Sequence, residues 1–232
     1  MCGRFTLRTP LNLVAEQFFI TLPGVLADRP RFNIAPSQPI LAVHQPSGGE
    51  SRQGVMLQWG LIPSWAKDPT IGNRMINARS ETAHQKPSFR AAFKNRRCLV
   101  LADGFYEWQK LSNGKQAWYF HRPDHQPFAF AGLWESWHGP GQQQELQSAT
   151  ILTTTPNECA RPVHDRMPVI LSEQDHDAWL DPDNPDLDAV GELMGPCPAD
   201  QLARTAVSSH VNSPRHDDQQ CIAEVPTEQE LF

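Results

Sequence analysis

The chain has 232 residues, of which 39% are hydrophobic and seven are tryptophan, and its formal net charge is −6. This length and apolar content predict a folded globular protein with one substantial core and exclude a disordered chain. No apolar run reaches the roughly 18 residues of a membrane helix, and the five cysteines form no CxxC pair, so we expect no membrane segment, no disulfide framework and no structural zinc site, in a reduced, cytoplasmic protein.

The charge is unevenly distributed along the chain. Residues 1–110 carry a formal charge of +7, and residues 111–232 carry −13. Such asymmetry indicates a basic binding surface with acidic surface elsewhere, as in proteins that bind nucleic acid. An acidic second half that only aids solubility is the alternative.

The N-terminus carries a cysteine directly after the start methionine. A leader peptide would begin with basic residues and an apolar run, which are absent here. Because cysteine is small, we expect methionine aminopeptidase to remove Met1, which leaves Cys2 with an α-amine of pKa ~8 and a thiol of pKa ~8.5. A modest shift of either pKa would make the residue nucleophilic, and together the two groups could convert an aldehyde into an imine and then into a thiazolidine ring. An ordinary cysteine near a terminus is the alternative.

Secondary structure is predicted mainly from apolar patterning. Thr9 as N-cap and Pro10 at the first helical position predict a helix with Leu11, Val14 and Phe18 on its apolar face. Strands are predicted at residues 40–43, 54–62, 97–102, 117–121, 127–133, 148–155 and 169–171. A capping box at 172–175 begins another helix, a short helix covers 187–194, and a strand begins at Val207.

Two stretches of the first half carry groups suited to single-stranded nucleic acid. Trp65 lies next to Ala66 and Lys67, which combines base stacking with positive charge, although a core tryptophan at a strand end would look the same. Arg79 could clamp a phosphate with two hydrogen bonds or form a structural ion pair with Glu81.

Two further residues are candidates for proton transfer. Glu107 lies between Tyr106 and Trp108, where an apolar environment would raise its pKa, but it could also point outward from a half-buried strand. His164 precedes Asp165 in a loop and could shuttle protons near neutral pH, or be a structural loop histidine.

The order of elements predicts the fold class. No repeat or linker divides the chain, so we expect a single domain over residues 1–232 with a peripheral tail after about residue 225. Many short strands with a few short helices predict an α+β fold around a mostly antiparallel sheet or partly closed β-barrel.

Seven motifs together resemble one protein family. They are MCGRF at 1–5, FNIAP at 32–36, WGLIP at 59–63, NARSET at 77–82, GFYEW at 104–108, HDRMP at 164–168 and VNSPR at 211–215. Each is modest alone, but in this order they resemble the SRAP (SOS-response-associated peptidase) family of abasic-site processing proteins. The resemblance extends to about Val225.

The resemblance implies a covalent reaction with single-stranded DNA that carries an abasic site. Cys2 would be the nucleophile, with its amine forming the imine at the opened sugar and its thiol closing the thiazolidine. Asn77 would orient the sugar or the amine, Glu107 would move protons, with β-elimination of the strand as a further activity, and His164 would assist sugar opening and reversal.

The resemblance also implies which residues contact the DNA. Three would hold phosphates: Arg4, Arg79 and Arg166. Four would line the DNA channel: Asn33, Pro36, Trp65 and Thr153. We expect a monomer that associates with the nucleoid when bound to DNA, and no metal or organic cofactor.

Two other classes of function remain open at this stage. One is an N-terminal-nucleophile peptidase or amidohydrolase, in which the α-amine of Cys2 activates its own thiol. The other is a non-catalytic module that binds single-stranded DNA and would tolerate Cys2→Ala.

Overall fold

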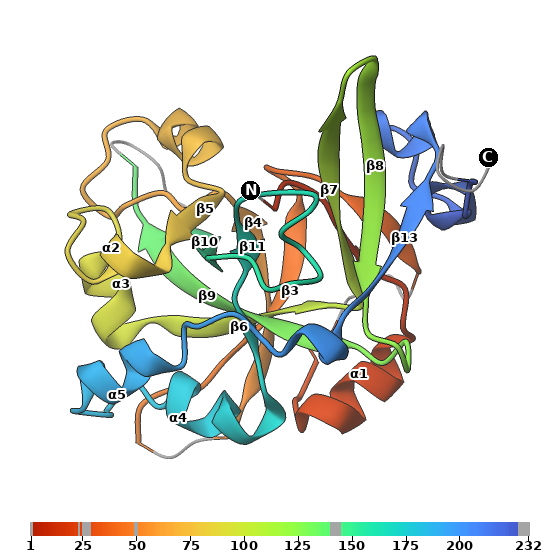
Figure 1. The fold of residues 1–232 in the computed structure, drawn as a ribbon. Helices are drawn as coiled ribbons and strands as arrows, with labels where there is room; N and C mark the ends of the chain where they lie inside the picture. Colours follow the sequence, from red (N-terminus) through yellow and green to blue (C-terminus); the bar gives the residue numbers. More distant parts are fainter. Residues whose placement is uncertain (1, 23, 25–28, 49–50, 140–144, 227–232) are drawn as a thin grey trace.

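A closed barrel of five strands forms the centre of the molecule (Figure 1). Its strands are β3 (Pro39–His44), β4 (Gln53–Trp59), β6 (Arg97–Ala102), β9 (Phe128–Trp137) and β10 (Leu146–Thr154). They follow one another in the order β10-β4-β3-β6-β9, and β9 pairs again with β10. All five pairings are antiparallel except β10 with β4. In this computed structural model, which describes residues 2–22, 24, 29–48, 51–139 and 145–226, the expected α+β fold is therefore confirmed.

The barrel core is built from strands whose side chains are buried on both faces. Every residue of β6 is buried, because α4 (His176–Leu180) packs against one side of the strand and β1 lies against the barrel. Trp179 of α4 donates its indole N–H to the carbonyl of Cys98, 2.9 Å away. Phe5 packs edge-on against Trp59, with ring centroids 5.1 Å apart. The start of the chain is therefore part of the core.

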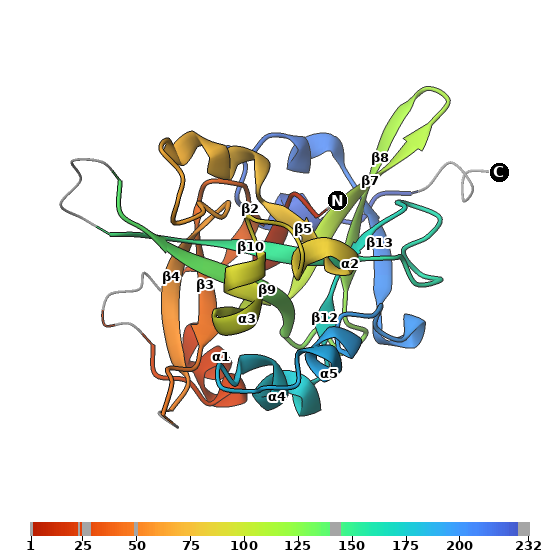
Figure 2. The same ribbon diagram turned by 90° about the vertical axis from the view of Figure 1, so that its left-hand side faces the viewer.

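A second sheet holds the N-terminal strand between longer neighbours. Its order is β13-β8-β7-β1-β2, with β1 (Phe5–Leu7), β2 (Arg31–Ile34), β7 (Gly104–Leu111), β8 (Gly114–His121) and β13 (Ala203–Val207). The β7–β8 hairpin projects beyond the rest of the molecule in both views (Figures 1 and 2). The described part of the chain begins beside the base of this hairpin.

Short elements extend strand β10 at its far end. The strand β5 (Asn77–Arg79) pairs with β10 in parallel, and β11 (Met167–Pro168) pairs with it on the other side. Thr153 of β10 is opposite both Arg79 and Pro168. The motifs that begin at Asn77 and at His164 are thus brought to one place.

The remaining elements are short. They comprise β12 (Ile170–Leu171), the helices α1 (Leu11–Phe18), α2 (Ser80–Ala83), α3 (Arg90–Asn95) and α5 (Leu187–Glu192), and the 3-10 helices η1 (Pro69–Arg74), η2 (Glu173–Asp175), η3 (Ala199–Gln201), η4 (Ser209–Asn212) and η5 (Gln219–Ile222). Figures 1 and 2 both place α1, α4 and α5 at one end of the molecule, away from the N-terminus. No helix in the described ranges is long and apolar enough to cross a membrane.

Several predicted boundaries differ from the structure. The N-cap of α1 is Pro10 and not Thr9, whose hydroxyl donates to Asp103. The strand predicted at 54–62 ends at Trp59, since Gly60 has φ 125° and a Cβ there would lie 2.6 Å from the carbonyl oxygen of Gly72. Val207 ends a strand and does not begin one.

Candidate functional site

Cys2 is buried and lies three residues before the start of β1. Its side chain has no solvent exposure, and its Sγ contacts the Arg4 carbonyl at 3.9 Å. Asn77 donates from Nδ2 to the Cys2 carbonyl, 2.7 Å away. The Oδ1 atom of Asn77 is buried and has no hydrogen-bond partner among the described residues. The amide of Asn77 therefore fixes Cys2 with one end and keeps an acceptor available at the other.

Glu107 faces the N-terminus from strand β7. Phe5 pairs with Phe105, and the Tyr106 amide donates to the Arg4 carbonyl at 3.0 Å, so the chain before β1 runs alongside Glu107. Only 4% of Glu107 is exposed, and burial raises the pKa of its carboxyl, while the charge of His164 opposes that rise. The alternative of an outward-pointing glutamate on a half-buried strand is therefore wrong.

The thiol of Cys2 differs from the sequence-based expectation. Burial raises its pKa well above the ordinary value, and the negative charge of Glu107 raises it further. A modest downward shift, which would make the thiol a nucleophile at neutral pH, is not found. A thiol with a pKa this far above its ordinary value stays protonated at neutral pH.

His164 is supplied by the loop that precedes β11. Its Nδ1 lies 3.0 Å from the backbone nitrogen of Arg166 and 2.8 Å from Oδ1 of Asp165. Nδ1 can serve these groups only in turn: unprotonated it accepts from the Arg166 N–H, and protonated it donates to Asp165. Nδ1 therefore has a hydrogen-bond partner whether or not it carries a hydrogen.

Arg166 is held by contacts within the protein. Its Nη1 and Nη2 donate to the two carboxylate oxygens of Glu81, at 2.5 and 2.9 Å, and Nη2 also donates to the Thr153 carbonyl. Glu81 therefore forms its ion pair with Arg166, and not with Arg79 as the sequence allowed. The Arg79 side chain is exposed. Thr153 is fully buried, so its side chain offers no surface to DNA.

Arg4 and Asn33 form one hydrogen-bonded unit. Arg4 donates from Nη1 to Oδ1 of Asn33 at 2.9 Å and to the Val211 carbonyl at 3.0 Å. Asn33 is fully buried, and its Nδ2 donates to the carbonyls of Val211, Ser213 and His216. Asn33 therefore has no exposed surface for the DNA contact expected of it, and instead orients the half-buried Arg4.

Trp65 and the exposed cations lie on the outside. Trp65 is 58% exposed and lines a hollow of about 420 Å³ together with Lys67 and Arg74. Pro36 is half-buried. An exposed aromatic ring and two cations thus line the same hollow, a combination that suits the bases and phosphates of a single-stranded nucleic acid.

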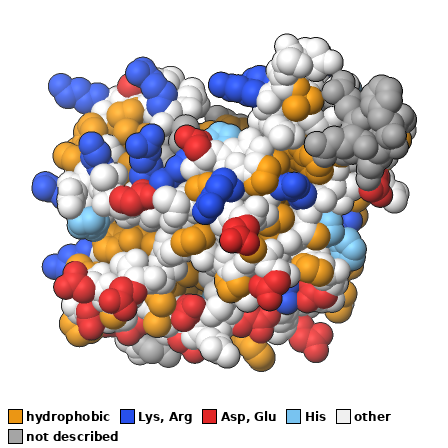
Figure 3. All heavy atoms as spheres, viewed as in Figure 1, with side chains coloured by type: hydrophobic (Ala, Val, Ile, Leu, Met, Phe, Trp, Pro, Cys, Tyr) orange, Lys and Arg blue, Asp and Glu red, His pale blue; other side chains and the backbone are white. Residues whose placement is uncertain are grey.

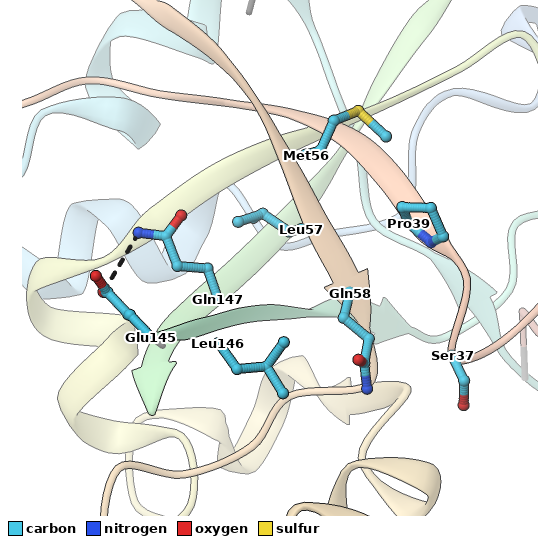
Figure 4. A pocket seen from close by; sticks show the side chains of 8 residues that line it. All are labelled: Ser37, Pro39, Met56, Leu57, Gln58, Glu145, Leu146 and Gln147. Carbon is cyan, nitrogen blue, oxygen red and sulfur yellow. Dashed lines mark hydrogen bonds between the residues drawn. The ribbon is translucent and has the colours of Figure 1, made fainter. Parts of the chain in front are cut away.

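A separate hollow lies beside strands β4 and β10. It has a volume of about 550 Å³, and Met56, Gln58, Glu145 and Gln147 line it (Figure 4). Gln147 donates to Glu145 across its wall at 3.4 Å. This hollow includes none of the candidate residues. The candidate site is instead the N-terminal cluster, which consists of Cys2, Asn77, Glu107 and His164.

Comparisons with known proteins agree on one family. A family model described as "SOS response associated peptidase (SRAP)" matches residues 1–214. The chain is 45% identical over 225 residues to the abasic site processing protein YoqW of Bacillus subtilis, covering 96% of this chain and 99% of that protein. It is 32% identical over 227 residues to the abasic site processing protein HMCES of Gallus gallus, covering 85% of this chain and 67% of that protein.

A solved structure has the same fold. A protein of Bacteroides thetaiotaomicron superimposes with a TM-score of 0.86 at 21% identity, over 97% of this chain and 100% of that chain. At this identity the likeness establishes the fold alone.

Proposed function

The chain belongs to the SRAP family, and we propose that it processes abasic sites in single-stranded DNA by joining the opened sugar covalently to Cys2. The carrying observation is that Cys2, an aminothiol once Met1 is removed, is held by Asn77 and electrostatically coupled to Glu107. The names of the relatives support abasic-site processing, and the chemistry of the cluster supports the covalent route.

The first step is attack by the amine of Cys2 on the C1′ aldehyde of the opened sugar. The nitrogen–carbon bond forms, the amine gives up two protons, and the aldehyde oxygen takes up two and leaves as water, the second proton coming from a general acid. Because burial raises its pKa, the carboxyl of Glu107 can hold and deliver that proton near neutral pH. The Oδ1 atom of Asn77 could accept a hydrogen bond from the amine and orient it.

The second step is addition of the thiol across the carbon–nitrogen double bond. Sulfur bonds to C1′, its proton passes to the imine nitrogen by way of Glu107, and a five-membered thiazolidine results. A thiol that stays protonated can take this second step. The attack is intramolecular, and the proton leaves the sulfur as the sulfur–carbon bond forms, so no free thiolate is required beforehand. Loss of a C2′ proton at the imine stage would instead break the C3′–O bond, expel the 3′ phosphate and so cleave the strand by β-elimination.

The other candidates take supporting roles in this scheme. His164 exchanges protons during sugar opening and reversal, using its two alternative partners. Arg79 and Arg4 face the phosphates, while Trp65 and Pro36 contact the strand. Arg166, whose guanidinium Glu81 already engages, positions the His164 loop.

The test is a denaturing gel with an oligonucleotide that carries one abasic site, without borohydride. Wild-type protein should give a band that survives denaturation, and Cys2→Ala should give none. Cys2→Ser keeps the amine but lacks the thiol, so it should be trapped only when borohydride is added. Intact mass establishes that Met1 is absent, and a wild-type protein without Met1 that gives no stable band would refute the proposal.

The two other classes predict different results. An amidohydrolase would need an activated thiol, which the raised pKa of Cys2 opposes. A simple binding module would keep all its function in Cys2→Ala, so the same variant separates it from the covalent scheme.

A further inference from the structure

Three side chains with metal-binding atoms converge in the C-terminal part of the chain. They are His210 of η4, Asp218 at the start of η5 and Cys221 within η5. Their ligand atoms all lie within 4.8 Å of one another, and Nε2 of His210 is 3.1 Å from Oδ2 of Asp218. The spacing of these residues follows no familiar zinc motif, so the cluster is not recognisable from the sequence pattern.

The surroundings hold each of the three groups in place. The ring of His216 stacks on that of His210, with centroids 3.9 Å apart and an angle of 9°. Oδ1 of Asp218 accepts the Gln220 amide at 2.9 Å. Cys221 is fully buried, while His210 and Asp218 are 25% and 53% exposed. The cluster is therefore fixed on its inner side and open to solvent on its outer side.

We propose that His210, Asp218 and Cys221 form a zinc site with water as the fourth ligand. Nitrogen, sulfur and oxygen donors together suit this borderline ion, whereas Mg²⁺ and Ca²⁺ require oxygen donors. Bonds of about 2.0–2.3 Å in a tetrahedron place ligand atoms roughly 3.3–3.7 Å apart. The His210–Asp218 spacing of 3.1 Å is close to this, and the Cys221 sulfur, which lies within 4.8 Å of both ligand atoms, would move toward them when the ion binds.

The charges of the site also balance. A thiolate and a carboxylate neutralise the two charges of Zn²⁺, so the loaded site is neutral. This is important because the Arg4 guanidinium is close enough to Cys221 to affect it electrostatically. A neutral zinc complex would be tolerated beside that cation.

Zinc would link η4 to η5 and so stiffen the edge that holds Arg4. The carbonyls of Val211 and Asn212 in η4 accept the Arg4 guanidinium, and that of Val211 also accepts Asn33. The metal would thus act as a structural clamp beside the N-terminal cluster. This inference does not depend on the proposed reaction of Cys2.

The test is zinc binding by chelator-treated full-length protein in a Cys2→Ser background, because the N-terminal aminothiol could itself chelate zinc. We expect one Zn²⁺ per chain at micromolar zinc, measured by elemental analysis after dialysis, and a higher Tm with zinc. Cys221→Ser and Asp218→Asn should each weaken binding by more than about tenfold, since even second-sphere changes cost about 10–100-fold. Cys159→Ser, which alters a half-exposed cysteine outside the cluster, should bind like the parent.

Cobalt substitution identifies the ligands directly. Co²⁺ should give a thiolate charge-transfer band that Cys221→Ser abolishes and Cys159→Ser retains. Less than one zinc per chain, or binding that neither Cys221→Ser nor Asp218→Asn weakens, would overturn the proposal. Circular dichroism checks that each variant is folded, and if the buried Cys221→Ser is not, the half-exposed Asp218→Asn decides the matter.

Discussion

At the scale of single residues, the N-terminal cluster combines two buried groups that both prefer their neutral forms. Burial raises the pKa of the Cys2 thiol and of the Glu107 carboxyl, and the Glu107 charge adds to the first effect. A folded protein gains nothing from burying a carboxyl that must ionise at neutral pH. Such a group at a reaction centre is expected to reduce stability in exchange for chemistry.

Glu107→Gln should therefore slow crosslinking and stabilise the protein. Because folding raises the pKa of Glu107, the carboxyl stabilises the folded protein at pH values below its ordinary pKa near 4.5. That contribution is lost as the pH rises through the pKa of the folded state. Glutamine removes this loss, so the Tm of the variant should exceed that of wild type at pH about 8 and approach it at pH about 4. Crosslinking should slow by about 100-fold or more, as for loss of a general acid or base.

Glu135→Gln provides the matched control. Glu135 is also buried, 5% exposed, but it pairs with Arg96 at 2.7 Å. Its replacement should lower the Tm at neutral pH, since it leaves Arg96 without its charged partner. A Tm for Glu107→Gln below wild type throughout this pH range would contradict the argument.

At the scale of elements, the position of β1 depends on one buried carboxylate. Asp103 accepts the Thr6 hydroxyl at 2.5 Å, the backbone amides of Arg8 and Thr9 at 2.5 and 2.8 Å, and the Thr9 hydroxyl at 3.0 Å. These bonds tie the end of β1 to the turn between β6 and β7. The N-terminal cysteine lies only a few residues away.

Asp103→Asn should destabilise the fold and loosen the N-terminus. An amide cannot accept all four donors, and its own N–H groups would face them, so we expect a loss of about 3 kcal/mol in the free energy of unfolding. Urea denaturation measures this loss. Asp68→Asn, at an exposed cap of η1, should leave the stability close to wild type. Equal stability of the two variants would show that Asp103 is not the anchor.

The ion pair between α2 and the His164 loop makes a second prediction at this scale. Arg166→Lys cannot form the two-bond contact with Glu81, so it should slow crosslinking about tenfold. The Tm should change little, because the Glu81 side chain is 48% exposed, although Arg166 is only 13% exposed, and ion pairs open to solvent on one side contribute about 0–1 kcal/mol. Glu81→Gln should have the same effect, and Arg161→Lys in the same loop should have none. If Glu81→Gln instead tightens DNA binding, Glu81 keeps Arg166 away from phosphates.

Local patterns predicted the elements better than their pairing. The strand at 97–102 matches β6 at both ends, and the helix from Leu11 to Phe18 matches α1. Closure of the barrel depends on β9 pairing with β10 and on the parallel contact of β10 with β4, which no local pattern encodes. The internal role of Asn33 depends in the same way on carbonyls from residues 211–216, far along the chain.

At the scale of the whole molecule, charge separates into two regions. Figure 3 shows Lys and Arg side chains mostly in the upper and left parts of the face, and Asp and Glu side chains along its lower edge, over α4 and α5. Residues 172–192, which include both helices, contain eight acidic residues and neither Lys nor Arg. The acidic end therefore lies away from the N-terminal cluster, which reconciles a net charge of −6 with the proposed binding of DNA at that cluster.

Reversible binding should consequently depend strongly on salt, while the covalent product should not. Two phosphate contacts, from Arg4 and Arg79, would give a slope of about −1.4 in a plot of log affinity against log salt concentration for single strands. Arg79→Gln should reduce the magnitude of that slope by about 0.7. Lys115→Gln removes the same charge from the projecting β7–β8 hairpin and should leave the slope unchanged. Equal slopes for the two variants would indicate diffuse attraction, and loss of the preformed complex on a jump to high salt would show that it is not covalent.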